Sequence, residues 1–214
     1  MPRINSAAEL DALRNDILSR QDPEKPAIAI CSGAGCHGLG NGGVIRAFEE
    51  EIEKHGLAGT VDIRATGCHG MCEQGPCVVI YPEEIYYVKV TPQDVPEIVK
   101  QTVQGKKVVD RLVYADAESG EKAVHLNEIP FYKYQSRILI SNNTRIDPAN
   151  IDDYFGIGGY AALSKALFEM KPEDVLGEVK KANLRGRGGG GFPAGLKWET
   201  TRNARQKQKY VIVN

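Results

Sequence analysis

Between residues 25 and 105, short apolar runs alternate with stretches in which apolar residues recur at helical spacing. Four of the runs have the length of buried strands, and they span residues 27–30, 61–65, 77–81 and 85–90. After the first run, the spacing predicts a helix that turns inward Val44, Ile45, Phe48 and Ile52. A closing helix begins with Thr91 as N-cap and Pro92 at its first position. It is predicted to bury Val95, Ile98, Val99 and Val103. This order predicts an α/β fold, a small open sheet with helices packed against it.

Outside this region the pattern changes twice. A capping box of Ser6 and Glu9 predicts a helix over residues 6–18. Apolar periodicity is lost after residue 105, and the polar stretch 115–122 predicts a turn within an exposed connector. We therefore expect a domain boundary in the connector.

Helical spacing returns towards the C-terminus. Helices are predicted after Gly158 and after Pro172, the second of them burying Val175, Leu176 and Val179. A strand is expected at 137–140. The apolar residues from Tyr210 onward are interpreted as a strand that belongs to a further sheet. We therefore expect the chain to be an N-terminal piece of a longer protein. The predicted organisation is an N-terminal helix at 1–24, the α/β domain at 25–105, a connector at 106–130 and an incomplete domain at 131–214.

Composition and charge narrow the possible functions. The chain has 214 residues, 26% of them charged, and a formal net charge of −1, so no overall field attracts nucleic acid or an anionic membrane. The basic run from Arg202 to Lys209 lacks interleaved aromatic residues and is interpreted as a solvated helix face. No apolar run has the length of a membrane span, and the N-terminus lacks a secretory signal pattern. We expect a cytoplasmic protein that neither inserts into a membrane nor binds nucleic acid.

Four cysteines form two close pairs in glycine-bearing loops. Cys31 and Cys36 are spaced as C-x4-C, and Cys68 and Cys72 as C-x3-C. Four thiolates suit tetrahedral iron or zinc, but structural zinc sites more often use the tighter C-x2-C spacing. The spacing also differs from that of plant-type ferredoxins. Iron–sulfur ligation is favoured, with zinc binding and unliganded core cysteines as the alternatives.

The remaining candidates near these pairs have simpler interpretations. Cys77 begins an apolar run and is predicted to be a buried cysteine that behaves as a small hydrophobic residue. The alternative is a spare ligand or a reactive thiol. His37 and His69 each follow a ligand candidate, and we expect both to face solvent rather than to bind metal.

At this point the chain shows a specific resemblance. The motifs C-S-G-A-G-C at 31–36 and G-C-H-G-M-C at 67–72, followed by Gly75-Pro76, resemble the thioredoxin-like 2Fe-2S ferredoxins. That family includes the small iron–sulfur subunit of respiratory complex I. The resemblance implies a thioredoxin-like fold and a 2Fe-2S cluster, and it maps the four ligands onto Cys31, Cys36, Cys68 and Cys72.

A glycine-rich block at 183–198 carries the second signal. Its G-x-G-x-x-G match follows a predicted helix rather than a strand, and it lacks the Gly-Lys pair of a P-loop, so both nucleotide motifs fail. The simple alternative is a flexible linker. The large apolar side chains of Phe192, Leu196 and Trp198 disfavour a linker. Glycine-rich backbone leading into a helix with a lysine still suits a phosphate or a flat ring.

The block closely resembles the flavin-binding loop in the NADH-oxidising flavoprotein subunit of complex I. Preceding motifs, including I-D-P-A-N-I-D-D-Y at 146–154, resemble the flavoprotein subunits of multimeric [FeFe]-hydrogenases, some of them electron-bifurcating, and of NAD-dependent formate dehydrogenases. The resemblance implies FMN and NAD(P)H in the full-length protein and other iron–sulfur subunits as partners. The residues it would place at the flavin or nicotinamide are Gly186, Arg187, Gly188, Gly189, Gly191, Phe192, Lys197 and Asn214.

The sequence thus predicts an electron-transfer subunit of an NAD(P)-linked oxidoreductase. We expect the ferredoxin-like domain to be followed by the beginning of a complex I flavoprotein-type α/β domain. Taken alone, this chain is not expected to retain FMN or to oxidise NADH. The competing hypotheses are a zinc-stabilised assembly module without a redox role and a thiol–disulfide protein using Cys68 and Cys72.

Overall fold

The computed structural model describes residues 3–210 and 212. Residues Ile17–Ile157 form one compact unit, and the described parts of Met1–Asp16 and Gly158–Asn214 form another. The strands are β1 (Ala27–Cys31), β2 (Asp62–Thr66), β3 (Val78–Tyr81), β4 (Ile85–Tyr87), β5 (Tyr114–Ala115) and β6 (Lys122–Ala123). The α-helices are α1 (Ala7–Arg20), α2 (Ala34–Gly38), α3 (Asn41–Lys54), α4 (Val95–Ile98), α5 (Pro130–Lys133), α6 (Ile151–Gly156), α7 (Ala161–Phe168), α8 (Pro172–Lys181) and α9 (Ala194–Asn203). Among the described residues, no helix combines the length and apolarity that a bilayer span requires.

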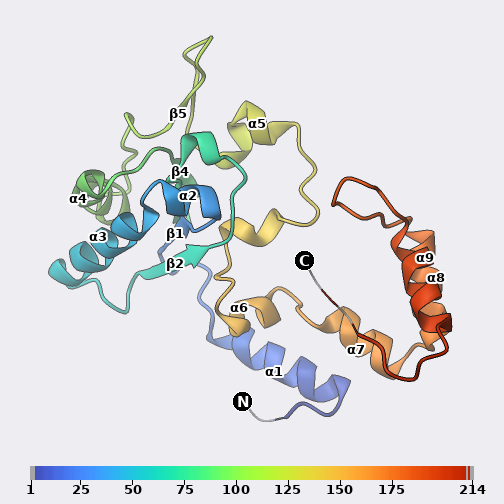
Figure 1. The fold of residues 1–214 in the computed structure, drawn as a ribbon. Helices are drawn as coiled ribbons and strands as arrows, with labels where there is room; N and C mark the ends of the chain where they lie inside the picture. The colour runs from blue at the N-terminus through green and yellow to red at the C-terminus, as the bar shows by residue number, and fades with distance from the viewer. Residues whose placement is uncertain (1–2, 211, 213–214) are drawn as a thin grey trace. The chain divides into compact units, whose positions relative to one another are not determined.

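A four-stranded sheet organises the first unit, in the order β2-β1-β3-β4 (Figure 1). Strand β1 pairs parallel with β2 and antiparallel with β3, which pairs antiparallel with β4. All four predicted strands are present, and the crossover from β1 to β2 contains α3. The predicted α/β arrangement is confirmed in this unit.

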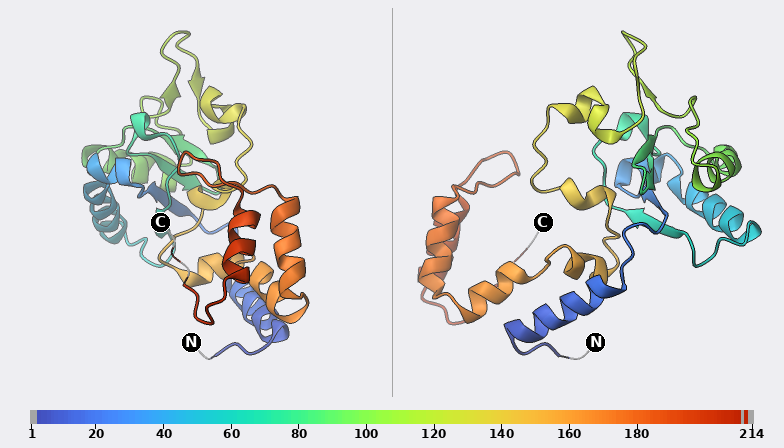
Figure 2. Two further views of the ribbon diagram at one scale, coloured as in Figure 1. Left: turned by 45° about the vertical axis from the view of Figure 1, so that its right-hand side comes forward. Right: turned by 180° about the vertical axis from the view of Figure 1, so that it is seen from behind.

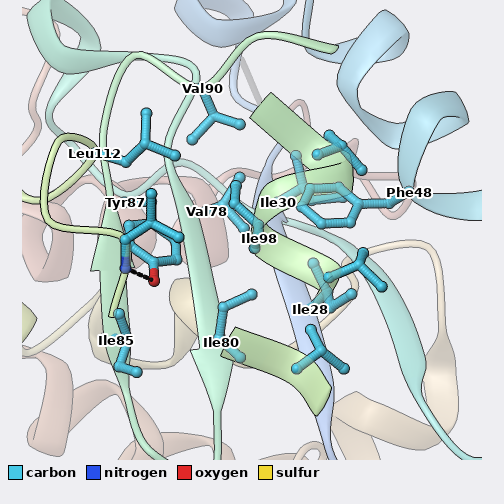
Figure 3. Close-up of a cluster of buried hydrophobic side chains, with 14 of the residues drawn as sticks. Ile28, Ile30, Phe48, Val78, Ile80, Ile85, Tyr87, Val90, Ile98 and Leu112 are labelled. Atoms are coloured by element: carbon cyan, nitrogen blue, oxygen red, sulfur yellow. Dashed lines mark hydrogen bonds between the residues drawn. The ribbon is translucent and has the colours of Figure 1, made fainter. Parts of the chain in front are cut away.

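The two faces of the sheet have separate cores because side chains alternate along each strand. On one face, Ile28 and Ile30 pack in a cluster with Phe48 of α3 and Ile98 of α4 (Figure 3). On the other face, Ala29 and Cys31 belong to a second cluster. The second cluster also contains Cys36, Cys77, Val79, Tyr86, Val88, Ala123, Ile129 and Tyr132. The cysteine loops therefore share a core with residues far along the chain.

The closing helix begins as predicted but is not uniform. Thr91 and Asp94 form a capping box at η2 (Pro92–Asp94), after which α4 continues into a π-helical turn, η3 (Val99–Gln104). Although burial raises the pKa of Asp94, hydrogen bonds from Thr91 and Arg111 outweigh it and hold that pKa below its ordinary range.

The segment after the closing helix packs partly on the sheet. Val109, Leu112 and Val113 are buried in the first cluster, and the hydroxyl of Tyr87 accepts a hydrogen bond from the Val109 amide at 2.9 Å, dashed in Figure 3. The polar turn between β5 and β6, residues 116–121, is exposed. Two short 3-10 turns follow later in this unit, η4 (Leu126–Glu128) and η5 (Ser141–Thr144).

The strand expected at 137–140 is wrong. These residues form an irregular segment and a turn, and Ile138 and Leu139 are 84% and 87% exposed. An apolar run becomes a strand only where a neighbouring strand can pair with it, and none does so here.

In the second unit, α8 and α9 pack together (Figure 2). A Cβ added at Gly195 would lie 2.6 Å from Cγ of Lys180, so only glycine permits this approach. Lys180 also pairs with Glu199 at 2.6 Å. The predicted burial of Val175, Leu176 and Val179 is only partial, because all three are half-buried. The N-terminal helix begins as expected, with the Glu9 amide donating to Ser6 Oγ at 3.2 Å. The reciprocal bond differs, because the Glu9 carboxylate accepts from the amide of Asn5.

Candidate metal centre

The two cysteine pairs meet at one edge of the sheet. Cys31 is the last residue of β1 and pairs in register with Thr66, the last residue of β2. Because parallel strands place their carboxyl ends at the same edge, the loops that follow β1 and β2 lie side by side. Cys36 lies in α2 within the first loop, and Cys68 and Cys72 lie in the second.

Glycines allow the two loops to interlock. A Cβ on Gly33 would lie 2.8 Å from Cβ of Cys68, and one on Gly35 would lie 2.8 Å from Sγ of Cys72. A third, on Gly75, would lie 2.7 Å from Sγ of Cys36. Any side chain at these three positions would occupy space taken by a cysteine. The glycines therefore form a close-fitting cradle around the thiols.

The four thiols lie close to one another. Cys31 interacts with Cys36 and Cys68 with Cys72, and the charge of Cys36 also acts on Cys72, so the two pairs are neighbours. Among the described His, Cys, Asp and Glu residues, no group of three or more is placed to hold a single metal ion. A [2Fe-2S] cluster uses four thiolates shared between two irons. The donor set and its glycine cradle fit such a cluster.

Exposure differs between the two pairs, and the pKa differs between the two members of the first pair. Cys31 and Cys36 are buried, whereas Cys68 is half-buried and Cys72 is exposed. Burial raises the pKa of the Cys31 thiol to about 12. Hydrogen bonding with Cys77 is the largest influence on Cys36 and lowers its pKa to about 6. The exposed Cys72 gives the site an edge that faces solvent.

Two backbone amides of the second loop point at cysteine sulfurs. The His69 amide donates to Sγ of Cys31 at 3.5 Å, and the Gly70 amide donates to Sγ of Cys68 at 3.3 Å. Gly70 has a φ of +89°, a left-handed conformation that suits glycine. Such hydrogen bonds to sulfur tune the reduction potential of an iron–sulfur cluster.

The expectation that His69 faces solvent is wrong, because its side chain is fully buried. Burial, and to a smaller extent the charge of Arg137, lowers the pKa of His69 to about 3, so the ring is neutral. Thr66 donates its hydroxyl to Ile30 O at 3.1 Å and therefore accepts from Nε2 of His69 at 2.9 Å. Neighbouring side chains in a tight loop diverge, and here the cysteine takes the outer position while the histidine fills the core. His37 is exposed, as expected.

The fifth cysteine is buried as predicted. Cys77 is 1% exposed in the second core cluster, and its thiol donates to Gln74 O at 3.3 Å. Its contact with Cys36 is an addition that the sequence did not indicate.

Three side chains near the site were not identified from the sequence. Asn143 donates to the carbonyl oxygen of Cys68 at 3.1 Å. Tyr132 and Arg137 both donate to the carbonyl oxygen of His69, at 3.0 Å and 2.8 Å. The only available signal was the aromatic run at 131–134, and it did not point to the cysteines.

The glycine-rich block forms an exposed, hairpin-like loop ahead of α9 (Figure 2). The Gly186 amide donates to Phe192 O at 2.9 Å, and Arg187 turns back to the Arg185 carbonyl at 2.8 Å. A Cβ at Gly188, Gly189 or Gly191 would meet no atom within 4 Å, so the backbone is open to a ligand. Lys197 is exposed in the first turn of α9. Asn214, the last predicted flavin residue, lies outside the described residues.

Two family models match the chain. Residues 16–103 match the thioredoxin-like [2Fe-2S] ferredoxin, and residues 179–214 match the Nuo51 FMN-binding domain. Both resemblances noted in the sequence are confirmed.

The curated relatives include small ferredoxins and much longer hydrogenase subunits. The 2Fe-2S ferredoxin of Clostridium pasteurianum is 40% identical over 77 residues, which are 36% of this chain and 76% of that protein. The NADP-reducing hydrogenase subunit HndC of Solidesulfovibrio fructosivorans is 46% identical over 82 residues, 38% of this chain and 16% of that subunit. The NAD-reducing hydrogenase HoxS subunit alpha of Cupriavidus necator is 29% identical over 164 residues, 77% of this chain and 24% of that subunit. The matched regions thus cover less than a quarter of either hydrogenase subunit.

Proposed function

Because the chain belongs to the thioredoxin-like [2Fe-2S] ferredoxin family, we propose that its two cysteine pairs hold a [2Fe-2S] cluster and that it transfers electrons. The proposed ligands are Cys31, Cys36, Cys68 and Cys72. When bound, such a cluster accepts and donates one electron at a time. The chain supplies the ligands, the amide hydrogen bonds to sulfur and a partly buried setting.

The pairing of the thiols carries this proposal. A structural zinc site arranges four donors tetrahedrally around one ion. Here the two thiol pairs are neighbours, and among the described residues no group of three or more candidate ligands is placed for a single ion. Two pairs set in a glycine cradle match the four-thiolate requirement of a dinuclear cluster.

Metal analysis of protein purified anaerobically tests the proposal. We expect two irons and two sulfides per chain, with the red-brown absorption of a [2Fe-2S] protein. Serine at any of the four ligands should lower the cluster content or distort its spectrum. Cys77→Ala is the matched control and should keep the spectrum. One zinc per chain without sulfide would contradict the proposal and indicate a zinc-stabilised assembly module. A metal-free protein with a Cys68–Cys72 disulfide would contradict it and indicate a thiol–disulfide protein.

We further propose that the chain works within an NAD(P)H-linked, FMN-containing oxidoreductase complex. We propose that this complex is a hydrogenase. The FMN-binding match at 179–214 and the two hydrogenase relatives support this. In the full protein the open loop from Gly186 to Phe192, with Lys197, would contact FMN, and other iron–sulfur subunits would exchange electrons with the ferredoxin domain. Electron bifurcation and a formate dehydrogenase are the finer alternatives. The ligand thiols require a reducing compartment, for which we propose the cytoplasm.

Isolation of the complex from its native host through a tag on this chain tests the wider proposal. We expect FMN in the preparation and hydrogen evolution driven by NADH or NADPH. Formate oxidation without hydrogenase activity would identify the formate dehydrogenase alternative. A complex that lacks flavin would contradict the proposal.

A further inference from the structure

Residues 129–145 fold back onto the loop that carries Cys68 and Cys72. Ile129 is fully buried and Tyr132 is 5% exposed, both in the core cluster that contains Cys31, Cys36 and Cys77. The ferredoxin family model matches residues 16–103. These contacts are therefore made by a part of the chain that lies beyond the matched domain.

The returning segment holds two consecutive carbonyl groups. Asn143 Nδ2 donates to the oxygen of Cys68 at 3.1 Å. Tyr132 Oη and Arg137 Nη2 both donate to the oxygen of His69, at 3.0 Å and 2.8 Å. The guanidinium also lies over the Tyr132 ring, 4.9 Å from its centroid, which fixes it beside the loop.

The same two peptide groups carry the amides that point at sulfur. In a planar trans peptide, the C=O and the following N–H point in opposite directions. With the Cys68 carbonyl held by Asn143, the His69 amide is directed at Sγ of Cys31, 3.5 Å away. With the His69 carbonyl held by Arg137 and Tyr132, the Gly70 amide is directed at Sγ of Cys68, 3.3 Å away.

We propose that Tyr132, Arg137 and Asn143 are positioning residues that raise the reduction potential of the cluster through these two peptide groups. The inference rests on the proposed [2Fe-2S] site. A hydrogen bond donated to a carbonyl polarises the peptide and strengthens its N–H as a donor. Reduction adds negative charge to the cluster and its thiolates, so stronger N–H···S bonds favour the reduced state. One sulfur from each cysteine pair receives such a bond.

Arg137 adds a second effect of the same sign. Its positive charge lies beside the Cys68 loop, with Nη2 4.0 Å from the position of a Cβ on Gly70. A nearby cation stabilises the more negative, reduced cluster. Asn143 is neutral, so its removal measures the peptide effect without a change of charge.

The test compares midpoint potentials of four variants by redox titration monitored by electron paramagnetic resonance. Asn143→Ala and Tyr132→Phe each remove one donor, and Arg137→Gln removes the charge as well. Arg145→Gln is the matched control, because Arg145 lies in the same segment but pairs with Glu84 and stacks over Tyr81. Iron and sulfide content and the resonance Raman frequencies of the Fe–S(Cys) bonds are measured on every variant.

We expect Asn143→Ala and Arg137→Gln to lower the reduced-to-oxidised ratio at a fixed potential by roughly three- to tenfold. For one electron, a tenfold change corresponds to about 59 mV. The Fe–S(Cys) frequencies should shift in the same variants, and Arg145→Gln should match the wild type in both readouts. Tyr132→Phe keeps the buried ring. If Arg137→Gln does not assemble a cluster, the midpoint potentials of Tyr132→Phe and Asn143→Ala test the inference.

Two results would overturn the inference. The first is unchanged potentials and frequencies in variants that carry a full cluster. The second is an equal shift in Arg145→Gln, which would show a general charge effect with no role for the two peptides. A wild-type chain without iron and sulfide would instead refute the proposed cluster site, so the two failures are distinguishable.

Discussion

Replacing Tyr87 by phenylalanine tests whether the segment after the closing helix belongs to the ferredoxin core. Tyr87 is fully buried, and its hydroxyl joins three elements. It lies 2.6 Å from Thr102 Oγ1 of η3 and accepts from the Val109 amide at 2.9 Å. Because Thr102 donates its own hydrogen to Lys107 O at 2.8 Å, the tyrosine donates to Thr102.

The expected loss of stability follows from the hydrogen-bonding groups that the substitution leaves without a partner. Phenylalanine keeps the buried ring, so little apolar burial is lost. The Val109 amide loses its partner in a buried position, which costs about 1–3 kcal/mol. The bond to Thr102 adds about 1 kcal/mol, because Thr102 keeps its bond to Lys107. A total of about 2–4 kcal/mol corresponds to a roughly 30- to 900-fold change in the opening equilibrium of this region.

Hydrogen exchange measured by mass spectrometry on the cluster-containing protein reads this equilibrium without unfolding the sample. Peptides that cover β4 and residues 99–113 should exchange faster by that factor. Tyr134→Phe is the control, because Tyr134 is 83% exposed. If both variants protect these peptides equally, residues 106–113 are not held by the core and the reasoning fails.

Four further outcomes are expected. Asp94→Asn should reduce, but not remove, the stability loss that the wild type shows as pH falls below about 5. A carboxyl with a depressed folded pKa stabilises the fold only while it is ionised, so the variant lacks the share of this one carboxyl; acid titration of the melting temperature checks this. Gly195→Ala should destabilise the α8–α9 pair by about 1–3 kcal/mol. Gly177→Ala in α8 meets no atom within 4 Å and should stabilise by about 0.4–1 kcal/mol, both read from Trp198 fluorescence on heating. This chain alone should lose FMN on gel filtration, because the 186–192 loop is largely exposed; stoichiometric acid-released flavin with NADH turnover would contradict that.

Local patterns predicted the ferredoxin sheet and its ligand loops. The apolar runs ending at Cys31 and near Thr66 gave two strands, and their parallel pairing brings the following loops together. The sequence placed glycines in both cysteine loops, and the structure shows that a Cβ at 33, 35 or 75 would overlap a cysteine. Each of these signals depends on residues within one strand or one loop.

The failures share a cause, which is contact over long sequence separation. The run at 137–140 is as apolar as a strand, but whether a strand pairs with it is decided elsewhere in the chain. His69 follows a ligand candidate in an exposed type of loop, yet the ring of Tyr86, far along the chain, lies 5.9 Å away and provides a buried position for it. Thr66, three residues before His69, bonds to the ring once it is buried, but the burial itself depends on the distant partner.

The contacts of residues 129–145 could not be predicted from the sequence for a further reason. Tyr132, Arg137 and Asn143 bond to carbonyl oxygens, which every residue possesses, so their partners carry no side-chain signature. A substitution at Cys68 or His69 would leave those oxygens in place, whereas a shift of the loop would break all three bonds. The coupling between this segment and the ligand loop therefore depends on backbone geometry. For that reason we expect insertions between residues 104 and 129 that displace the segment to lower the cluster potential, even when every cysteine and every donor is kept.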